Sequence, residues 1–460
     1  MAAKRTSLHG EWSSRWAFIL AATGSAVGLG NIWRFPFIAG ENGGGAFVLL
    51  YLLCVLVVGV PILMAEILLG RRGRRSPLNA MRALAADGGH ARAWQAVGWM
   101  GMVAGFVILS YYSVIAGWTL AYGLRAACGV FEGVQSQDTA RIFADFTSDP
   151  EKLLAWHTIF MAMNIVVVSR GVRSGLERAV RYLMPALFLL LILLAGYAMS
   201  TEKFDEGIAY LFVPHMDRFT GDFGSVFLNA LGQAFFSLSL GMGAMMVYGS
   251  YLPERASIPA CALSVAFADT LVAVLAGIAI FPVIFSYGMQ PSGGAGLIFI
   301  SLPIAFGQMP GGEVLGTLFF LLLMFAAWTS SISLLEPAVS WLVENVGMSR
   351  IRAAASAGAA AWLLGLLTVM SFSHWAFSFR FAGVQKNRGF FDLFDVVAAN
   401  FLLPAGGVLI ALFAAWLMPA RITREELNLD RVGYAMWRIA TRYLAPIGVL
   451  VIMLHGTGLI

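Results

Sequence analysis

Apolar runs long enough to cross a membrane recur along the whole chain, and they restrict its fold more than any other feature of the sequence. A transmembrane α-helix needs roughly 20 mostly apolar residues. The pattern therefore predicts eleven transmembrane helices, and it lacks the strict alternation of a transmembrane β-barrel. The runs cover about residues 15–38, 45–70, 96–124, 153–170, 177–199, 225–250, 258–287, 312–343, 353–373, 393–417 and 440–459.

The composition agrees with a membrane protein and excludes several soluble classes. Of the 460 residues, 59% are hydrophobic and 12% are charged, whereas a soluble domain carries about 25% charged residues. So few charges cannot cover a water-soluble chain of this length. This excludes a cytosolic enzyme, a disordered scaffold and a secreted disulfide-rich protein. Cys54, Cys128 and Cys261 lie singly without a metal-binding spacing, and we expect each to be an unpaired, buried thiol.

Arginine residues gather in alternate connections between the runs. By the positive-inside rule, this predicts a multi-pass protein of the cell inner (plasma) membrane with a cytoplasmic N-terminus. Eleven helices then place the C-terminus outside. The net charge of +5 reflects this topology, so the expected partner is the lipid bilayer and not nucleic acid. The basic connections contain Arg71, Arg72, Arg74 and Arg75, then Arg170, Arg173, Arg178 and Arg181, and later Arg421, Arg424 and Arg431.

The first run contains residues that disfavour a continuous helix. Three glycines, Gly24, Gly28 and Gly30, lie beside Asn31 and Arg34. Glycine favours an unwound backbone, and unwound backbone at membrane depth must line a cavity enclosed by protein. Close helix packing by small residues is the alternative, but it does not explain the Asn or the Arg. We therefore predict a discontinuous first helix.

The sixth run repeats this pattern, with Ser237, Ser239, Gly241 and Gly243 inside an apolar segment. Interruptions in the first and sixth runs divide the chain into two halves of five helices. Because five is odd, the second half must start from the opposite side of the membrane, which makes the repeat inverted. We therefore predict one transmembrane domain over residues 1–460. It consists of a first repeat at 15–199, a second repeat at 225–417 and an extra helix at 440–459.

Other polar residues are expected at the same depth. The seventh run holds Asp269, and an intramembrane carboxylate is costly unless it has a partner. Single hydroxyls in helices usually bond to their own preceding turn, but a cluster of four in the eighth run is harder to dismiss. Oxygen ligands of these kinds suit hard cations, and clustered thiolates or histidines are missing. The further polar residues are Thr329, Ser330, Ser331 and Ser333 in the eighth run and Tyr111 and Tyr112 in the third.

Together these residues resemble the neurotransmitter:sodium symporter family, in particular its bacterial amino-acid transporter branch. The resemblance implies an all-α polytopic membrane fold with a 5+5 inverted repeat and discontinuous first and sixth helices. It also implies a sodium-coupled amino-acid importer that works by alternating access and is not an enzyme. The matching segments are Gly24–Pro36, Glu41–Phe47, Tyr111–Tyr112, Phe235–Ser239, Gly296–Phe299 and Thr329–Ser331.

The resemblance implies two Na⁺ sites and one substrate site. The first ion would contact the Ala26 carbonyl, Asn31, Ser237, Asp269 and the substrate carboxylate. The second would contact the Gly24, Val27 and Ala326 carbonyls and the Thr329 and Ser330 hydroxyls. The substrate carboxylate would meet the Leu29 and Gly30 amides and the Tyr112 hydroxyl, and its ammonium would meet Ala26, Phe236, Ser237 and Ser239. Ser25 borders this position, and Ile108, Tyr112, Phe236, Met242, Ser333 and Leu334 would surround the substrate side chain.

Carried over in the same way, Arg34 and Asp395 form an external gate above Phe236. Asp392 is a rival partner for Arg34, which as an alternative would reach the membrane surface. At the cytoplasmic gate this chain departs from the family. His9 takes the place of an Arg before Trp12, Arg5 lies further upstream, and Glu344 replaces an Asp.

Two further departures concern chloride and assembly. Chloride-dependent animal members have an Asn and a Ser where this chain has Asp269 and Ala273. The fixed carboxylate would replace the halide, so we expect transport to be chloride-independent. Many relatives have a twelfth helix, so the oligomeric state stays open.

The predicted pocket carries no group that would pair with a charged side chain, which favours large neutral amino acids, hydrophobic or aromatic. Alanine or glycine stays open as the substrate, because one methylene group changes the free energy of binding by only about 1–3 kcal/mol. A membrane amino-acid sensor on the same fold is the alternative function. Proton coupling through Asp269 in place of Na⁺ is the alternative coupling.

Overall fold

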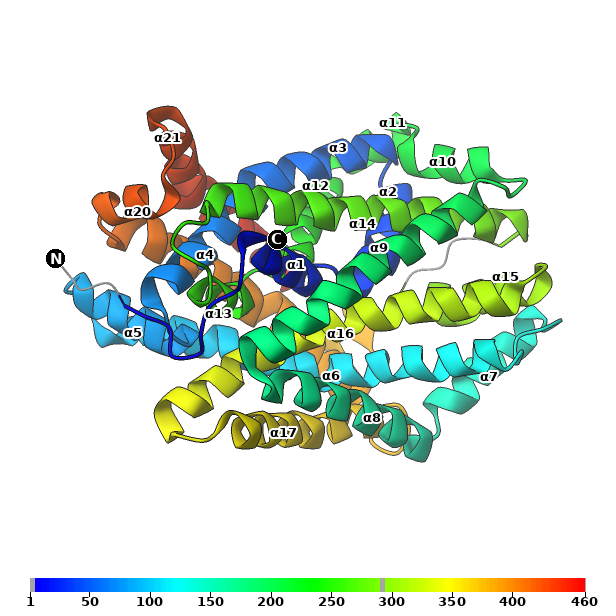
Figure 1. Ribbon diagram of the computed structural model, residues 1–460. Coiled ribbons are helices and arrows are strands. Elements are labelled where there is room, and N and C mark those ends of the chain that lie inside the picture. Colours follow the sequence, from blue (N-terminus) through cyan, green and yellow to red (C-terminus); the bar gives the residue numbers. More distant parts are fainter. Residues whose placement is uncertain (1–4, 290–293, 460) are drawn as a thin grey trace.

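The computed structural model describes residues 5–289 and 294–459, and in this part of the chain it consists almost wholly of helices (Figure 1). The exception is one short antiparallel hairpin, in which β1 (Phe379–Phe381) pairs with β2 (Val384–Lys386). Ala382 and Gly383 turn the hairpin with positive φ angles of 47° and 78°.

Nine helices of the described residues are long and apolar enough to cross a membrane. They are α3–η2–α4 (Gly45–Cys54, Val55–Gly59, Val60–Gly73), η3–α6 (Arg92–Trp94, Gln95–Ala127), α8 (Pro150–Ser169), η4–α9 (Val172–Glu177, Arg178–Ala198), α14 (Ile258–Ser286), α16 (Gly312–Val346), α17 (Arg350–Ser371), α18–η6–α19–η7 (Gly389–Asp395, Val396–Leu402, Leu403–Leu412, Phe413–Leu417) and α21–η8–α22 (Arg431–Ile439, Ala440–Leu444, Ala445–Gly456).

The first predicted helix is discontinuous, as expected. Helix α1 (Arg15–Ala26) ends before residues 27–29, and the chain resumes as η1 (Gly30–Arg34) and α2 (Phe35–Glu41). The two parts are bent by 61°. Ser14 caps the start of α1, because its hydroxyl accepts a hydrogen bond from the Ala17 amide.

The sixth predicted helix is also interrupted. Helix α12 (Phe223–Ser237) and helix α13 (Ala244–Ser250) are separated by residues 238–243. Ser239, Gly241 and Gly243 have positive φ angles there. At Gly241 a side chain is also excluded by space, since a Cβ would lie 2.3 Å from the Leu403 carbonyl oxygen.

The count of eleven spans and the inverted repeat stay predictions. The described residues give nine continuous spans and one bent pair, and α12 and α13 are each too short to be counted by themselves. The last span begins at Arg431, earlier than the predicted residue 440. Shorter helices in the connections are α5 (Pro77–Asp87), α7 (Ser136–Thr147), α10 (Phe204–Phe212), α11 (Met216–Gly221), η5–α15 (Leu297–Ser301, Leu302–Gln308) and α20 (Ala420–Leu427).

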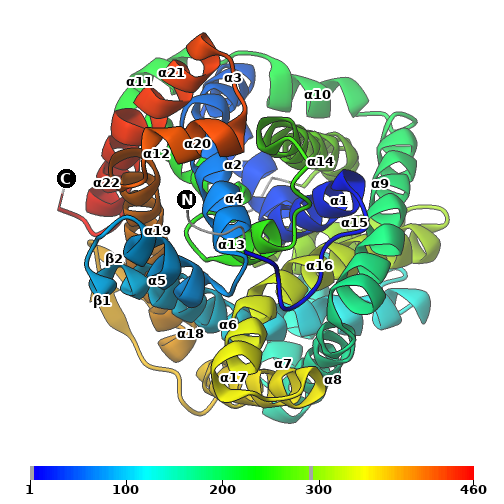
Figure 2. The same cartoon turned by 60° about the vertical axis from the view of Figure 1, so that its left-hand side comes forward.

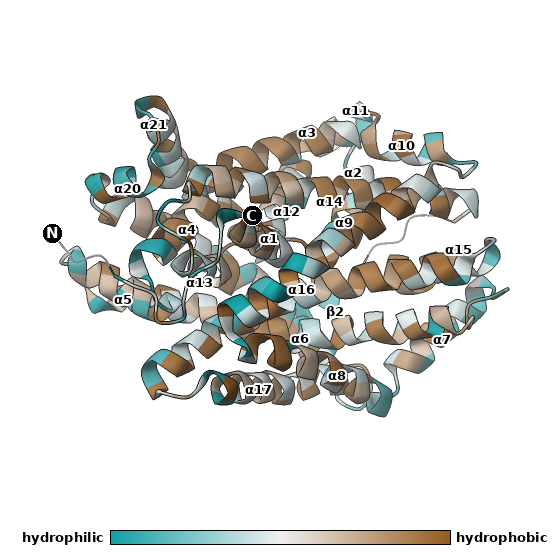
Figure 3. Cartoon of the chain, viewed as in Figure 1, coloured by the Kyte–Doolittle hydropathy of each residue, from teal (hydrophilic) through white to brown (hydrophobic). Residues whose placement is uncertain are grey.

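The interrupted helices lie in the middle of the bundle. Seen more nearly end-on, α1 and α13 are surrounded by the longer helices (Figure 2). Burial separates inner helices from outer ones: 72% of the apolar window is buried in α6 and in α16, against 17% in the last span. Hydrophilic residues gather at the two ends of the bundle (Figure 3).

The three cysteines are free, as predicted, and Cys54 and Cys261 are buried. Cys128 is exposed, contrary to expectation. It directly follows the end of α6 at Ala127, so it lies at the end of the bundle and outside the packed interior.

Candidate ion and substrate site

A cavity of 400 Å³ lies where the two interrupted helices meet α6 and α16. All twelve residues predicted for the substrate site line it, although they come from four separate stretches of the chain. They are Ser25, Ala26, Leu29, Gly30, Ile108, Tyr112, Phe236, Ser237, Ser239, Met242, Ser333 and Leu334.

The predicted residues of the first ion site form one buried cluster beside this cavity. The Asn31 amide donates to Asp269 Oδ1 at 2.7 Å and to Ser237 Oγ at 3.0 Å. Ser237 Oγ donates to Asp269 Oδ2 at 2.5 Å. Asp269 is wholly buried. Polar side chains from η1 and α12 therefore surround the Asp269 carboxylate of α14 beside the cavity.

The residues of the second predicted ion site also come together. Ser330 Oγ on α16 lies 3.2 Å from the Gly24 carbonyl oxygen, 2.8 Å from that of Val27 and 3.1 Å from that of Ala326. Thr329 Oγ1 lies 3.2 Å from the same Ala326 oxygen. The end of α1 thus presents its last carbonyl groups to hydroxyls of α16, and neutral oxygen atoms make up this cluster.

The unwound backbone carries the polar wall of the cavity. The Leu29 amide faces the Tyr112 hydroxyl at 3.4 Å, which joins two of the groups assigned to the substrate carboxylate. Ser239 Oγ donates to the Ser25 carbonyl at 2.9 Å and links the two helix breaks. Ser25 Oγ donates to Ser333 Oγ at 2.7 Å. Apolar side chains, including those of Ile108 and Leu334, line the remaining wall.

The predicted external pair is not in contact. In the described residues no ion pair joins Arg34 to Asp395 or to its rival Asp392. The Arg34 guanidinium instead lies over the Phe236 ring, 5.1 Å from its centroid. Asp395 Oδ1 accepts from the Tyr111 hydroxyl at 3.4 Å, and Asp392 accepts from the backbone amide of Arg388 at 2.8 Å.

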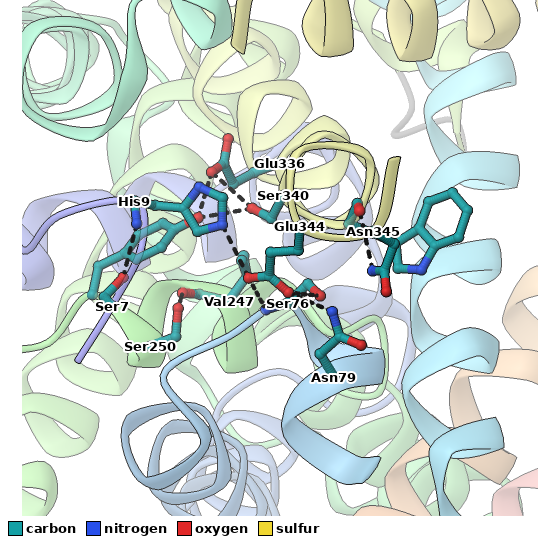
Figure 4. Close-up of polar contacts among 12 residues, drawn as sticks. Ser7, His9, Ser76, Asn79, Val247, Ser250, Glu336, Ser340, Glu344 and Asn345 are labelled. Atoms are coloured by element: carbon teal, nitrogen blue, oxygen red, sulfur yellow. Dashed lines mark hydrogen bonds and ion pairs between the residues drawn. The ribbon is translucent and has the colours of Figure 1, made fainter. Parts of the chain in front are cut away.

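A buried polar cluster joins the N-terminal segment to α16 and to the start of α5 (Figure 4). His9 Nε2 lies 3.0 Å from Glu344 Oε1, and their side chains are only 3% and 1% exposed. Glu344 also accepts from the Ser76 amide and hydroxyl, at 2.8 and 2.5 Å, and from Asn79 at 2.7 Å. Arg5 pairs with Asp87 at 2.9 Å. The contact to Glu344 is thus made by His9 and not by Arg5.

Some buried polar residues near the site escaped the sequence analysis. Glu66 is wholly buried on α4, where its Oε1 accepts from the Gly241 amide of the second helix break at 2.6 Å. Glu336 is wholly buried on α16 and pairs with Arg350. The argument applied to Asp269, that an acid inside an apolar run needs a reason, would have found both. The Gln233 amide is buried without a hydrogen-bond partner among the described residues, and the buried Tyr51 hydroxyl lies beside Asp269 and Ser237.

A membrane-spanning helical bundle with a polar cavity between two discontinuous helices has the architecture of a secondary transporter. Comparison with known sequences identifies the family to which this transporter belongs. The model of the sodium:neurotransmitter symporter family matches residues 9–130 and 147–457. The chain belongs to this neurotransmitter:sodium symporter family, and its relatives are transporters and not enzymes.

Two of the following three relatives match this chain over nearly its full length. An uncharacterized sodium-dependent transporter of Bacillus subtilis, YhdH, is 36% identical over 458 residues, with 98% of each chain covered. The mouse sodium-dependent neutral amino acid transporter B(0)AT3 is 29% identical over 306 residues, which cover 59% of this chain and 47% of that one. The crystal structure of MhsT in complex with L-phenylalanine has 40% identity and a TM-score of 0.87, covering 97% of this chain and 99% of that one.

Proposed function

We propose that this protein is a Na⁺-coupled importer of large neutral amino acids. The observation that carries the proposal is the central cavity, which combines a carboxylate-centred polar cluster, backbone groups at two helix breaks and an apolar wall. Ile108, Met242 and Leu334 offer a hydrophobic side chain a surface without fixed charge. Met242 is flexible and polarizable. The phenylalanine bound to the similar MhsT structure supports an amino acid of this class.

Two ions of different environment fit the two oxygen clusters. The first ion would replace the hydrogen bonds among Asn31, Ser237 and Asp269, with the Ala26 carbonyl and the substrate carboxylate as further ligands. The second ion would displace the hydrogen bonds that the Ser330 hydroxyl makes to the carbonyls of Gly24, Val27 and Ala326. The carbonyl oxygens and the hydroxyl oxygen would then coordinate the ion. Because the substrate carboxylate completes the first site, Na⁺ and substrate must raise each other's affinity by the same factor.

Alternating access would use the two sides of the cavity. The cluster around His9 and Glu344 would form the inner gate, at the end of the bundle that we assign to the cytoplasm. Arg34, Asp395 and Phe236 would form the outer gate. Closure of the outer gate would bring the Arg34 guanidinium from the Phe236 ring to the Asp395 carboxylate, above the substrate.

Purified protein in proteoliposomes tests the function. An inward Na⁺ gradient is expected to drive concentrative uptake of labelled phenylalanine, and an equal K⁺ gradient is not. Competition by each of the twenty amino acids should rank leucine, methionine, phenylalanine and tryptophan above alanine and glycine. Binding without flux would contradict a transporter and favour a sensor. Uptake that follows a proton gradient and ignores Na⁺ would contradict sodium coupling.

Tyr112→Phe isolates the contact to the substrate carboxylate. The variant keeps the ring against the cavity wall but removes the hydroxyl that faces the Leu29 amide. A hydrogen bond to a charged group contributes about 1.5–3 kcal/mol, so apparent phenylalanine affinity should fall about 10- to 100-fold. Scintillation proximity binding measures this, and Tyr182→Phe, on the exposed face of α9, is the matched control. An unchanged affinity would remove Tyr112 from the substrate site.

A further inference from the structure

A second large cavity lies away from the transport site, on the outer side of the bundle. It has a volume of 330 Å³ and is formed by α6, α16 and α17. It shares no residue with the substrate cavity. Its wall is almost entirely apolar and includes Trp99, Val103 and Phe106 on α6, Trp341 on α16 and Ala360 on α17. In Figure 2 these three helices run together at the lower edge of the bundle.

The position of this groove shows what kind of surroundings it meets. All three helices that form it have the length and apolarity of membrane spans. Trp99 and Val103 are 39% and 41% exposed, so the groove opens sideways, toward lipid. The Trp99 and Trp341 rings lie 5.0 Å apart. Tryptophan is enriched where hydrocarbon meets the lipid headgroups, which places this end of the groove near the membrane surface.

A free positive charge marks the same end. Arg352 is exposed and lies one helical turn before Ser356, a groove residue, on the same face of α17. Within the described part of the chain the Arg352 guanidinium has no hydrogen bond and no ion pair. The neighbouring Arg350 is different, because it bonds to Glu336 and to the Val168 carbonyl. Of these two arginines, only Arg352 is free to meet an anion.

We propose that this groove binds one anionic phospholipid, with an acyl chain between α6, α16 and α17 and the phosphate on Arg352. The apolar wall matches the chain, and the free guanidinium matches the charge of the headgroup. Small side chains create the space, since Ala357 and Ala360 face the two tryptophans across the groove. A lipid in this groove would contact α16. The same helix carries Ser330 and Ser333, which line the central cavity.

Lipid retention in native mass spectrometry tests the proposal with two variants. Arg352→Gln removes the charge, and Ala360→Leu fills the groove from an exposed position on α17. Ala162→Leu, at an exposed alanine of α8, is the matched control for the added methylenes. The probes are phosphatidylglycerol and phosphatidylcholine with identical acyl chains, added to delipidated protein in detergent.

The wild type and Ala162→Leu are expected to retain one phosphatidylglycerol with an affinity about fivefold above phosphatidylcholine, since one arginine near a lipid surface contributes about 1 kcal/mol. Arg352→Gln should bind both lipids equally, and Ala360→Leu should lose the retained lipid. Equal retention of phosphatidylglycerol by all four proteins would overturn the proposal. A change in oligomeric mass in Ala360→Leu would also overturn it, because a second copy of the chain would then cover the groove.

A second measurement does not depend on lipid surviving transfer to the gas phase. Phosphatidylglycerol with brominated acyl chains quenches nearby tryptophan fluorescence. The quenched fraction should fall in Trp99→Phe and not in Trp16→Phe, which removes an exposed tryptophan of α1. Equal quenching in the two variants would show that the lipid has no preference for the groove.

Discussion

Asp269→Asn is expected to lower Na⁺-driven uptake about 100-fold or more in chloride-free buffer. The substitution keeps the size of the side chain and one acceptor oxygen for the Asn31 amide, while the hydrogen bond with Ser237 has to reverse its direction. It removes the only full charge among the proposed protein ligands of the first ion. At an effective dielectric constant of about 20, two unit charges 4 Å apart interact by about 4 kcal/mol. The loss should therefore appear mainly as a weaker apparent affinity for Na⁺.

Chloride should partly restore uptake by this variant. The Gln233 amide is buried without a hydrogen-bond partner among the described residues, and the Tyr51 hydroxyl lies beside Asp269. Gln233 lies one turn before Ser237 on α12, so donors are available near the carboxylate that has been removed. An anion held there would again balance the charge of Na⁺. Adding Ala273→Ser should strengthen the effect by supplying one more hydroxyl.

Uptake measured with and without chloride, replaced by gluconate, gives the decisive comparison. The wild type should show no chloride dependence, and Asp269→Asn/Ala273→Ser should gain about tenfold from chloride, the effect of one hydrogen bond to a charged group. Asp145→Asn, which neutralises an exposed acid of α7, is the matched control for an Asp-to-Asn change away from the ion site. Steep chloride dependence of the wild type would refute the proposed role of Asp269.

The sequence predicted the membrane class and the discontinuous first helix from local chemistry: apolar runs, glycines that unwind a helix, and polar groups that apolar surroundings do not tolerate. The residues of the central cavity were predicted from the resemblance to a known family. Asn31, Ser237 and Asp269 were predicted as a group from resemblance, and their contacts are now seen in three dimensions. Their role as Na⁺ ligands stays a proposal.

Contacts between distant segments were harder to predict. The sequence left both Arg5 and His9 as partners for Glu344, because the path of the N-terminal segment is set by packing. Trp12 fixes that path, since its amide donates to the Tyr251 carbonyl and its indole donates to the Tyr248 carbonyl. Glu66 could have been predicted as an acid inside an apolar run, but its partner could not. The partner is the backbone amide of Gly241, and a backbone group has no signature in the sequence.

The contact between His9 and Glu344 leads to the last prediction, which concerns the balance between closed and open inner gates. Glu344 is buried, so loss of a partner leaves its carboxylate with an unsatisfied hydrogen bond. A hydrogen bond to a charged group contributes about 1.5–3 kcal/mol. His9→Leu should therefore favour the open inner gate by about 10-fold or more. His9→Arg should keep the gate closed, because the guanidinium can also donate a hydrogen bond to the Glu344 carboxylate.

Hydrogen exchange at the N-terminal segment measures this balance directly. The Trp12 amide is protected by its bond to the Tyr251 carbonyl, at 2.9 Å, and opening of the gate breaks that bond. Exchange in the peptide containing Trp12 should accelerate about 10-fold in His9→Leu. It should be no faster than wild type in His9→Arg. His90→Leu is the matched control, since His90 bonds to the Leu417 carbonyl and not to the gate. If His9→Leu exchanges like the wild type, His9 has no part in closing the inner gate, and Ser76 and Asn79 hold Glu344 alone.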